Sequence, residues 1–168
     1  MIKYVSILLY ISVWDAIVIN KQPAKAEMIA IGCDHGALDL KNQLIEHLKK
    51  RGIECKDTGC YTNESCDYPV YAKKVTALVT GGECELGILL CGTGIGMSIA
   101  AKVKGIRAAL CSDCFSAEAT RQHNDANVLC LGARVIGPEL AFRIADTFID
   151  AEFSGDERHK RRISMLED

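Results

Sequence analysis

Residues 86–96, LGILLCGTGIG, join a continuous apolar run to a turn that is rich in glycine. The run from 86 to 91 has no polar interruption, which is typical of a strand that is buried on both faces of a parallel sheet. The segment that follows the turn, 95–102, is rich in small and apolar residues and predicts a helix. A strand, a tight turn and a helix in this order indicate an α/β fold.

The same alternation continues on both sides of this segment. Short apolar runs predict five strands, and each is followed by a segment with helical periodicity. The expected strands are 28–33, 53–57, 86–91, 106–111 and 128–131, and the expected helices are 38–50, 69–79, 95–102, 116–123 and 138–149, with a charged tail at 155–168. The pattern predicts a Rossmann-like three-layer αβα sandwich with a five-stranded parallel sheet. In such folds, ligands bind at the carboxyl ends of the strands.

The composition limits the partners of this chain. It has 168 residues, of which 49% are hydrophobic, and this is enough to bury a real core. A net charge of -2 and a pI of about 6.1 create no overall attraction for nucleic acid or for an anionic membrane, so we expect neither as a partner. No linker-like composition interrupts residues 28–168, which we expect to form a single domain.

Nine cysteines are spread along the chain, and this odd number fits a fully paired disulfide scaffold poorly. Several lie inside apolar runs, such as Cys111 and Cys130, where a free thiol behaves as a small hydrophobic group. We therefore expect a reducing, cytoplasmic compartment. Cys111 and Cys114 have the CxxC spacing, but no second CxxC completes a zinc site, so local packing is favoured over metal or redox chemistry.

Residues 1–27 differ from the rest of the chain. Their apolar stretch, 4–19, contains Asp15 and is too short and too interrupted to span a bilayer comfortably. One interpretation is a signal peptide with a small-residue cleavage site at 24–26. The other is an upstream extension before a natural start at Met28, which opens a strand directly. We favour the extension and leave these residues out of the catalytic argument.

The turn after the central strand has the spacing GxGxG at residues 92–96. Its glycines expose backbone N–H groups in front of a helix N-terminus, which is an arrangement that binds negative charge. The spacing differs from the GxGxxG of dinucleotide-binding proteins, and no P-loop lysine follows. The alternative is a tight turn that merely needs glycine. Cys91 precedes the turn, where the helix dipole favours a thiolate, but the chemistry alone leaves catalytic and buried structural roles equally open.

Three other segments carry polar side chains that suit a site. Asp34 and His35 follow the first strand, where they could be an acid/base pair or contact a phosphate, although Asp34 could merely cap the next helix. His123 and Asn124 end the helix after the fourth strand, where a histidine could bind substrate or simply favour the helix C-terminus. The basic run 158–162 could clamp phosphate, could be solvated surface, or could be lent to a neighbouring subunit.

Together these segments resemble the type B ribose-5-phosphate isomerase family, which includes galactose-6-phosphate isomerase subunits. The matching motifs are Gly32-Cys33-Asp34-His35, Asp67-Tyr68-Pro69, Cys91-Gly92-Thr93-Gly94-Ile95-Gly96, Arg121-Gln122-His123-Asn124-Asp125 and Gly132-Ala133-Arg134-Val135. The resemblance implies an isomerase of the pentose phosphate pathway that interconverts ribose 5-phosphate and ribulose 5-phosphate through an enediolate. It also implies no metal and no organic cofactor, and a homodimer, or alternatively a tetramer, with shared active sites.

The resemblance implies a role for each matching residue. Cys91 is expected to move a proton between C1 and C2, and Thr93 to help shuttle the hydroxyl proton. His123, assisted by Asp34, is expected to open the furanose ring. The backbone amides of Gly92, Gly94, Ile95 and Gly96 are expected to stabilise the enediolate, Tyr68 and Asn124 to contact sugar hydroxyls, and His35, Arg134, Arg158 and Arg162 to bind phosphate. A base beside fixed N–H donors is what proton abstraction next to a carbonyl requires.

Two other functions remain open. A non-catalytic sugar-phosphate or nucleotide sensor would need only the glycine turn and the arginines, so the presence of Cys91, Thr93 and His123 together disfavours it. An isomerase for six-carbon or unphosphorylated sugars would differ only in substrate. Cys91 favours ribose 5-phosphate over galactose 6-phosphate, because we expect the paired subunits for the latter to divide the catalytic residues between them.

Overall fold

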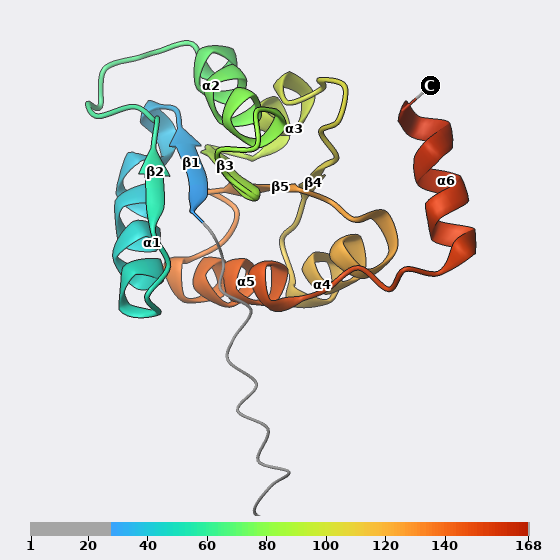
Figure 1. Ribbon diagram of the computed structural model, residues 1–168. Coiled ribbons are helices and arrows are strands. Elements are labelled where there is room, and N and C mark those ends of the chain that lie inside the picture. Colours follow the sequence, from blue (N-terminus) through green and yellow to red (C-terminus); the bar gives the residue numbers. More distant parts are fainter. Residues whose placement is uncertain (1–27, 168) are drawn as a thin grey trace, which may run out of the picture.

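The computed structural model describes residues 28–167, which contain a parallel sheet of five strands (Figure 1). The strands are β1 (Ile29–Cys33), β2 (Cys55–Asp57), β3 (Leu86–Cys91), β4 (Ala108–Leu110) and β5 (Val128–Gly132). They lie in the order β2-β1-β3-β5-β4, and every pairing is parallel. β3 is therefore central, and all six of its residues are buried, as the apolar run predicts.

Helices cover both faces of the sheet (Figure 1). They are α1 (Leu38–Lys50), α2 (Tyr68–Thr80), α3 (Ile95–Ala100), α4 (Cys114–Asn124), α5 (Pro138–Asp150) and α6 (Glu157–Glu167), with a short 3₁₀ helix, η1 (His35–Ala37). α2 and α3 pack together on one face, while α5 packs between α1 and α4 on the other. Each face has its own buried apolar cluster. The predicted three-layer αβα sandwich is confirmed.

The two edge strands are shorter than the sequence predicts. The apolar runs indicated strands at 53–57 and 106–111, whereas β2 and β4 each span three residues. Each edge strand pairs with a single neighbour, so fewer of its residues are held in the ladder by hydrogen bonds. α4 begins at Cys114, two residues before the predicted start, because Asp113 caps it by accepting a 2.7 Å hydrogen bond from the Ser116 N–H.

α1 shows a burial that the sequence pattern does not predict. Leu40, Leu44 and Leu48 face the core, and Lys41 is also completely buried. Its Nζ lies 2.7 Å from Asp57 Oδ2 and 3.1 Å from the carbonyl oxygen of Cys60. The lysine therefore ties α1 to the end of β2 and to the loop that follows it.

Residues 1–27 lie outside the residues that the structure describes. That they form an upstream extension therefore stays a prediction. Among the helices described between residues 28 and 167, none is long and apolar enough to cross a membrane. All nine cysteines are free, and six of them are buried, which agrees with their expected behaviour as small hydrophobic side chains.

Candidate active site

The carboxyl ends of β1 and β3 lie side by side in the middle of the sheet. From this pair the strand order runs outward in opposite directions, and such a point is where α/β sheets leave a crevice for ligands. The backbone N–H of Asp34 donates a 3.1 Å hydrogen bond to the Leu90 carbonyl, which holds the loop after β1 against the end of β3. The two loops that the sequence singles out are therefore neighbours.

Cys91 is the last residue of β3, and its side chain is turned into the glycine loop. It is buried, and its Sγ accepts a 3.0 Å hydrogen bond from the Gly94 N–H. Gly94 has a φ of 77°, a left-handed conformation that only glycine adopts without strain. The Gly94 N–H therefore fixes the position of the Cys91 sulfur inside the loop.

The loop amides are not all available to a ligand. Gly94 N–H is occupied by Cys91, and Ile95 N–H donates a 3.3 Å hydrogen bond to Thr93 Oγ1. The next amides of α3, beginning with Gly96, have no partner within a helix because the first turn lacks preceding carbonyls. The amides of the glycine turn therefore form two groups. Those of Gly94 and Ile95 position Cys91 and Thr93, and the others can face a ligand.

Gly132, at the end of β5, allows the glycine loop to lie where it does. A Cβ atom added there would be 2.6 Å from the carbonyl oxygen of Thr93, which is too close for any side chain. Sequence reasoning recognised Gly132 only as part of a family motif. The signal that could have revealed its role is its position, because it ends a strand that lies beside β3 in the sheet.

Asp34 performs the capping role that the sequence left as an alternative. Its Oδ1 accepts a 2.9 Å hydrogen bond from the Gly36 N–H at the start of η1. The carboxylate is only half-buried, so capping leaves it a second oxygen for another partner. The capping and the predicted acid/base role are therefore compatible.

His35 is held by a residue that sequence reasoning missed. Its Nδ1 accepts a 3.2 Å hydrogen bond from the Cys66 N–H, and the Cys66 Sγ lies 3.8 Å from the same nitrogen. Because Nδ1 accepts, a neutral ring carries its proton on Nε2, which is then free to donate. Cys66 stands directly before the motif Asp67-Tyr68-Pro69, but its contact with His35 joins residues that are 31 positions apart.

Arg134 and Tyr68 complete the surroundings of these loops. The Arg134 N–H donates a 2.9 Å hydrogen bond to the Gly92 carbonyl, and its side chain lies 3.4 Å from the place where a Gly92 Cβ would be. The Tyr68 ring lies 3.1 Å from the corresponding point on Gly96. Asp34, His35, Cys91 and the glycine loop therefore share one surface with Arg134 and Tyr68, which we call the cysteine half-site.

The other predicted residues lie on α4 and α6 and form a second group, which we call the histidine half-site. It consists of His123, Asn124, Arg158 and Arg162, all of which are exposed. The His123 ring lies 4.7 Å, between centroids, from the ring of His159 on α6. Among the hydrogen bonds, ion pairs and ring contacts found within residues 28–167, none joins the two half-sites.

His159 holds α6 beside α4. Its Nδ1 lies 2.9 Å from Ser154 Oγ, and the ring is buried. Burial, and then the nearby positive charge of Arg158, lower the pKa of His159 below its usual value. Sequence reasoning counted His159 only as part of a basic run, whereas the neutral ring is the packing contact that places His123 beside the tail.

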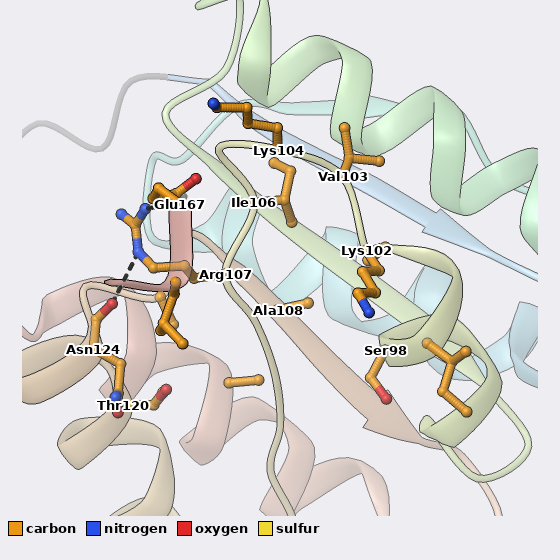
Figure 2. A pocket seen from close by; sticks show the side chains of 15 residues that line it. Ser98, Lys102, Val103, Lys104, Ile106, Arg107, Ala108, Thr120, Asn124 and Glu167 are labelled. Carbon is orange, nitrogen blue, oxygen red and sulfur yellow. Dashed lines mark hydrogen bonds and ion pairs between the residues drawn. The ribbon is translucent and has the colours of Figure 1, made fainter. Parts of the chain in front are cut away.

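A hollow of about 960 Å³ lies away from Cys91. It borders α3, the segment 101–109, Asn124 and the end of α6 (Figure 2). On its rim the Asn124 carbonyl accepts a 2.9 Å hydrogen bond from Arg107 Nε. Its walls include the exposed apolar side chains of Ile99, Val103 and Leu166. Lys102, Lys104 and Glu167 also line it, but no residue of the cysteine half-site does, so we do not place the sugar-phosphate chemistry there.

A smaller hollow of about 280 Å³ lies beside His35. It is enclosed by η1, the start of α1 and the start of α5, and Gln43 and Asn63 add polar groups to its wall. This hollow adjoins the cysteine half-site, and its size suits a small polar group. Within residues 28–167, no cluster of three or more histidine, cysteine or acidic side chains is arranged to hold a metal ion.

The comparisons with known proteins agree on one family. A family model described as ribose/galactose isomerase matches residues 29–166. The chain is 50% identical over 139 residues to the ribose-5-phosphate isomerase B of Escherichia coli strain K12, covering 82% of this chain and 93% of that protein. It is also 50% identical over 129 residues to the D-erythrulose-4-phosphate isomerase of Pectobacterium atrosepticum, covering 76% of this chain and 85% of that one.

The fold agrees with the sequence comparison. The solved structure of ribose-5-phosphate isomerase B from Clostridium thermocellum superposes with a TM-score of 0.82 at 51% identity, covering 83% of this chain and 95% of that one. The resemblance inferred from the motifs is confirmed, and so is the expectation of a sugar-phosphate isomerase. The chain belongs to the ribose/galactose isomerase family.

Proposed function

We propose that this protein interconverts ribose 5-phosphate and ribulose 5-phosphate through an enediolate. The observation that carries the proposal is the 3.0 Å hydrogen bond from the Gly94 N–H to the Cys91 Sγ, at the crevice between β1 and β3. It holds the Cys91 sulfur in a fixed position where a carbonyl compound would bind. Relatives whose names specify ribose 5-phosphate support the choice of substrate.

Cys91 acts as the base in the proposed mechanism. Its thiolate removes a proton from the carbon beside the sugar carbonyl, and the same sulfur returns the proton to the neighbouring carbon. Negative charge then develops on two oxygens, so fixed N–H donors near both oxygens lower the barrier. The amides of Gly92 and Gly96 supply this stabilisation, while Gly94 and Ile95 hold the reacting side chains. Thr93 helps to move the proton between the two oxygens.

The substrate enters as a closed ring and must first be opened. His123 protonates the ring oxygen, with Asp34 as its assistant, and Tyr68 and Asn124 contact the sugar hydroxyls. These residues fall into different half-sites within one chain. The mechanism therefore needs a second copy whose histidine half-site faces the cysteine half-site of the first.

The exposed surface supports a homodimer of this kind. Ile95 and Ile99, beside the glycine loop, are 51% and 67% exposed, and Leu166 on α6 is 69% exposed. Ile99 and Leu166 line the hollow of about 960 Å³, and α6 stands at the rim of the molecule (Figure 1). A second copy seated there would cover these side chains and bring Arg158 and Arg162 toward His35 and Arg134 to bind the phosphate. A homodimer is the simplest assembly that completes the site.

The preferred substrate length is the finer question within this proposal. A relative named for D-erythrulose 4-phosphate has the same 50% identity to this chain as one named for ribose 5-phosphate, but over 129 residues instead of 139. We favour the five-carbon substrate on the names of the structural relatives. A place in the pentose phosphate pathway follows from this choice, because ribose 5-phosphate is made and used in that pathway. A cytoplasmic location follows with it.

The test is exchange of the C2 proton of ribose 5-phosphate with solvent, measured by NMR for the natural protein and for Cys91→Ala. We expect exchange and turnover to fall about 100-fold or more in the variant, the usual scale for loss of a general base. Cys114→Ala is the matched control, because Cys114 is half-buried at the start of α4, outside both half-sites. Full activity in Cys91→Ala would contradict the assigned role.

Two further assays separate the alternatives. Turnover of ribose 5-phosphate, D-erythrulose 4-phosphate, allose 6-phosphate and free allose under the same conditions ranks the substrates, and a clear preference for any but the first would overturn the choice of substrate. Calorimetric binding of ribose 5-phosphate without turnover in the natural protein would support the sensor instead of the enzyme.

A further inference from the structure

Arg107, directly before β4, is a charged residue that the proposed reaction does not use and that contacts two helices. Its Nε donates hydrogen bonds of 2.9 Å and 3.0 Å to the carbonyl oxygens of Asn124 and Asp125, at the end of α4. One terminal nitrogen lies 3.1 Å from Asp125 Oδ2, and the other donates a 2.8 Å hydrogen bond to Glu167 Oε1, at the end of α6. Figure 2 shows Arg107 between Asn124 and Glu167. The guanidinium therefore connects the carboxyl ends of the two helices that carry the histidine half-site.

The end of α4 has a backbone conformation that needs support. Asp125 has a φ of 45°, and it is the one residue other than glycine with a positive φ among residues 28–167. A side chain makes this left-handed conformation unfavourable unless other contacts hold it. The Asp125 carboxylate accepts hydrogen bonds from Arg107 and, at 3.0 Å, from Arg121. Because the turn at Asp125 directly follows His123 and Asn124, the two arginines fix the segment that presents these two residues.

α6 is held mainly by polar contacts at its two ends. Of its residues that the structure describes, His159 is the one that is buried, and the second half of the helix exposes apolar side chains such as Leu166. Glu167 holds the far end, because its Oε2 accepts a 3.0 Å hydrogen bond from the Gly105 N–H while its Oε1 accepts from Arg107. His159 and Glu167 lie roughly 12 Å apart along the helix axis. Loss of the contacts at Glu167 would leave α6 attached at its first turn alone.

We propose that Arg107 and Glu167 are positioning residues, whose ion pair sets the distance between α6 and the end of α4. Arg158 and Arg162 lie four positions apart and therefore share one face of α6. A sugar phosphate has a nearly fixed separation between its ring oxygen and its phosphorus, so the groups that bind its two ends must keep a matching separation. This role of the ion pair rests on the proposed functions of His123 at the ring and of the two α6 arginines at the phosphate.

Glu167→Gln tests the ion pair with little change of shape. The amide nitrogen of glutamine cannot accept a hydrogen bond, so the side chain loses either its contact with Arg107 or its contact with the Gly105 N–H. We expect the KM for ribose 5-phosphate to rise about three- to ten-fold, the scale of one hydrogen bond. The kcat should change by less than about two-fold, because a misplaced phosphate contact weakens binding and leaves the chemistry at Cys91 intact. Steady-state kinetics measure both constants.

Glu83→Gln is the matched control for this variant. It makes the same substitution in an exposed ion pair, in which Lys56 Nζ lies 2.6 Å from Glu83 Oε2. Glu83 precedes β3 and belongs to neither half-site. We expect its KM and its kcat to match those of the natural protein.

Arg107→Lys tests the other partner. Lysine keeps the charge but has a single nitrogen, which cannot serve the Asn124 carbonyl and Glu167 in the way that the guanidinium does. The KM should rise at least as much as in Glu167→Gln. Combining the two substitutions should raise the KM by less than the product of the single effects, because both remove the same contact. An effect equal to that product would overturn the pairing of the two residues.

Removal of the α6 arginines separates positioning from a general structural role. In a background of Arg158→Ala with Arg162→Ala, α6 has no phosphate contact to misplace, so adding Glu167→Gln should change kcat/KM by less than about two-fold. A structural role elsewhere would lower kcat/KM equally with and without the arginines. Thermal unfolding and light scattering show whether each variant keeps its fold and its oligomeric state.

The possible results distinguish the ion pair from the proposed function. An unchanged KM in Glu167→Gln, or an equal loss of kcat/KM in both backgrounds, would overturn the positioning role. A rise in KM that appears together with dissociation into single chains would also overturn it, because Glu167 would then act in subunit contact. An unchanged KM in Arg158→Ala with Arg162→Ala would instead contradict the proposed phosphate site, and this is visible before Glu167 is changed.

Discussion

At the scale of single residues, the site depends on glycines at which neighbouring groups fill the space that a side chain would need. Gly132 admits the Thr93 carbonyl, and Gly96 admits the ring of Tyr68. The first contact is with backbone, which cannot move away, whereas the second is with a side chain that is 38% exposed and can rotate. The two positions should therefore respond differently to substitution.

Gly96→Ala should affect binding without harming the fold. The new Cβ would lie 3.1 Å from two carbons of the Tyr68 ring, so the ring must shift and its hydroxyl loses its place beside the sugar. We expect KM to rise about three- to ten-fold, equivalent to one hydrogen bond. The unfolding temperature should stay the same or rise, because alanine favours a helix over glycine by about 1 kcal/mol. Steady-state kinetics and thermal unfolding measure the two effects.

Gly137→Ala is the matched control for this prediction. Nothing lies within 4 Å of the position that its Cβ would take, and its φ of -77° suits any residue. We expect its KM to match that of the natural protein. An unchanged KM in Gly96→Ala would show that Tyr68 does not contact the substrate.

At the scale of elements, the loop between β2 and α2 is held in place by α1, the helix that packs against β1 and β2. Lys41 projects from α1 and reaches both Asp57, at the end of β2, and the Cys60 carbonyl. A buried ammonium needs such partners, since an unpaired one would be strongly unfavourable. The lysine also lies 4.7 Å from the centre of the Tyr61 ring. α1 thus positions the residues that approach His35.

Lys41→Met should destabilise the fold. The methionine fills the same space but leaves the Asp57 carboxylate and the Cys60 carbonyl without their donor. We expect the free energy of unfolding to fall by about 3 kcal/mol, the lower end for breaking a buried pair, because Asp57 is 28% exposed. Urea unfolding measures the change. Lys49→Met, at an exposed position of the same helix, should change it by less than about 0.5 kcal/mol. Equal losses in the free energy of unfolding for the two variants would contradict this anchoring role of Lys41.

At the scale of the whole molecule, the chain carries every predicted residue but separates them into two half-sites. The cysteine half-site lies at the carboxyl ends of the central strands, and the histidine half-site lies on α4 and α6. Exposed apolar side chains lie between them on α3. This separation makes the proposed dimer testable by mixing inactive variants.

Equal amounts of Cys91→Ala and His123→Ala, each inactive alone, should regain about a quarter of the natural activity when they are refolded together. About half of the dimers are then mixed, and one of the two sites in each mixed dimer is intact. Mixing Cys91→Ala with Asp34→Ala should restore nothing, because both changes fall in the same half-site and every site keeps a defect. Failure of the first mixture to recover, with mixed dimers shown by mass spectrometry, would rule out shared sites.

The sequence by itself determined the layered fold and most of the cysteine half-site. Its apolar runs are local signals, since a strand buried on both faces needs uninterrupted apolar residues, and β3 matches its predicted bounds. The rule that ligands bind at strand ends then placed Asp34 and the glycine loop together, as the hydrogen bond from Asp34 to Leu90 confirms. The edge strands were predicted too long, because the number of neighbours of a strand cannot be read from its own residues.

Only the tertiary structure decided which distant groups meet. The burial of Lys41, the contact of Cys66 with His35 and the fit of Tyr68 over Gly96 join residues that are 16 or more positions apart, and no periodic pattern encodes them. The same holds for the division into two half-sites, because α6 packs beside α4 through His159. Helix and strand signals arise from neighbours in the chain, whereas the surroundings of a side chain depend on how the elements pack.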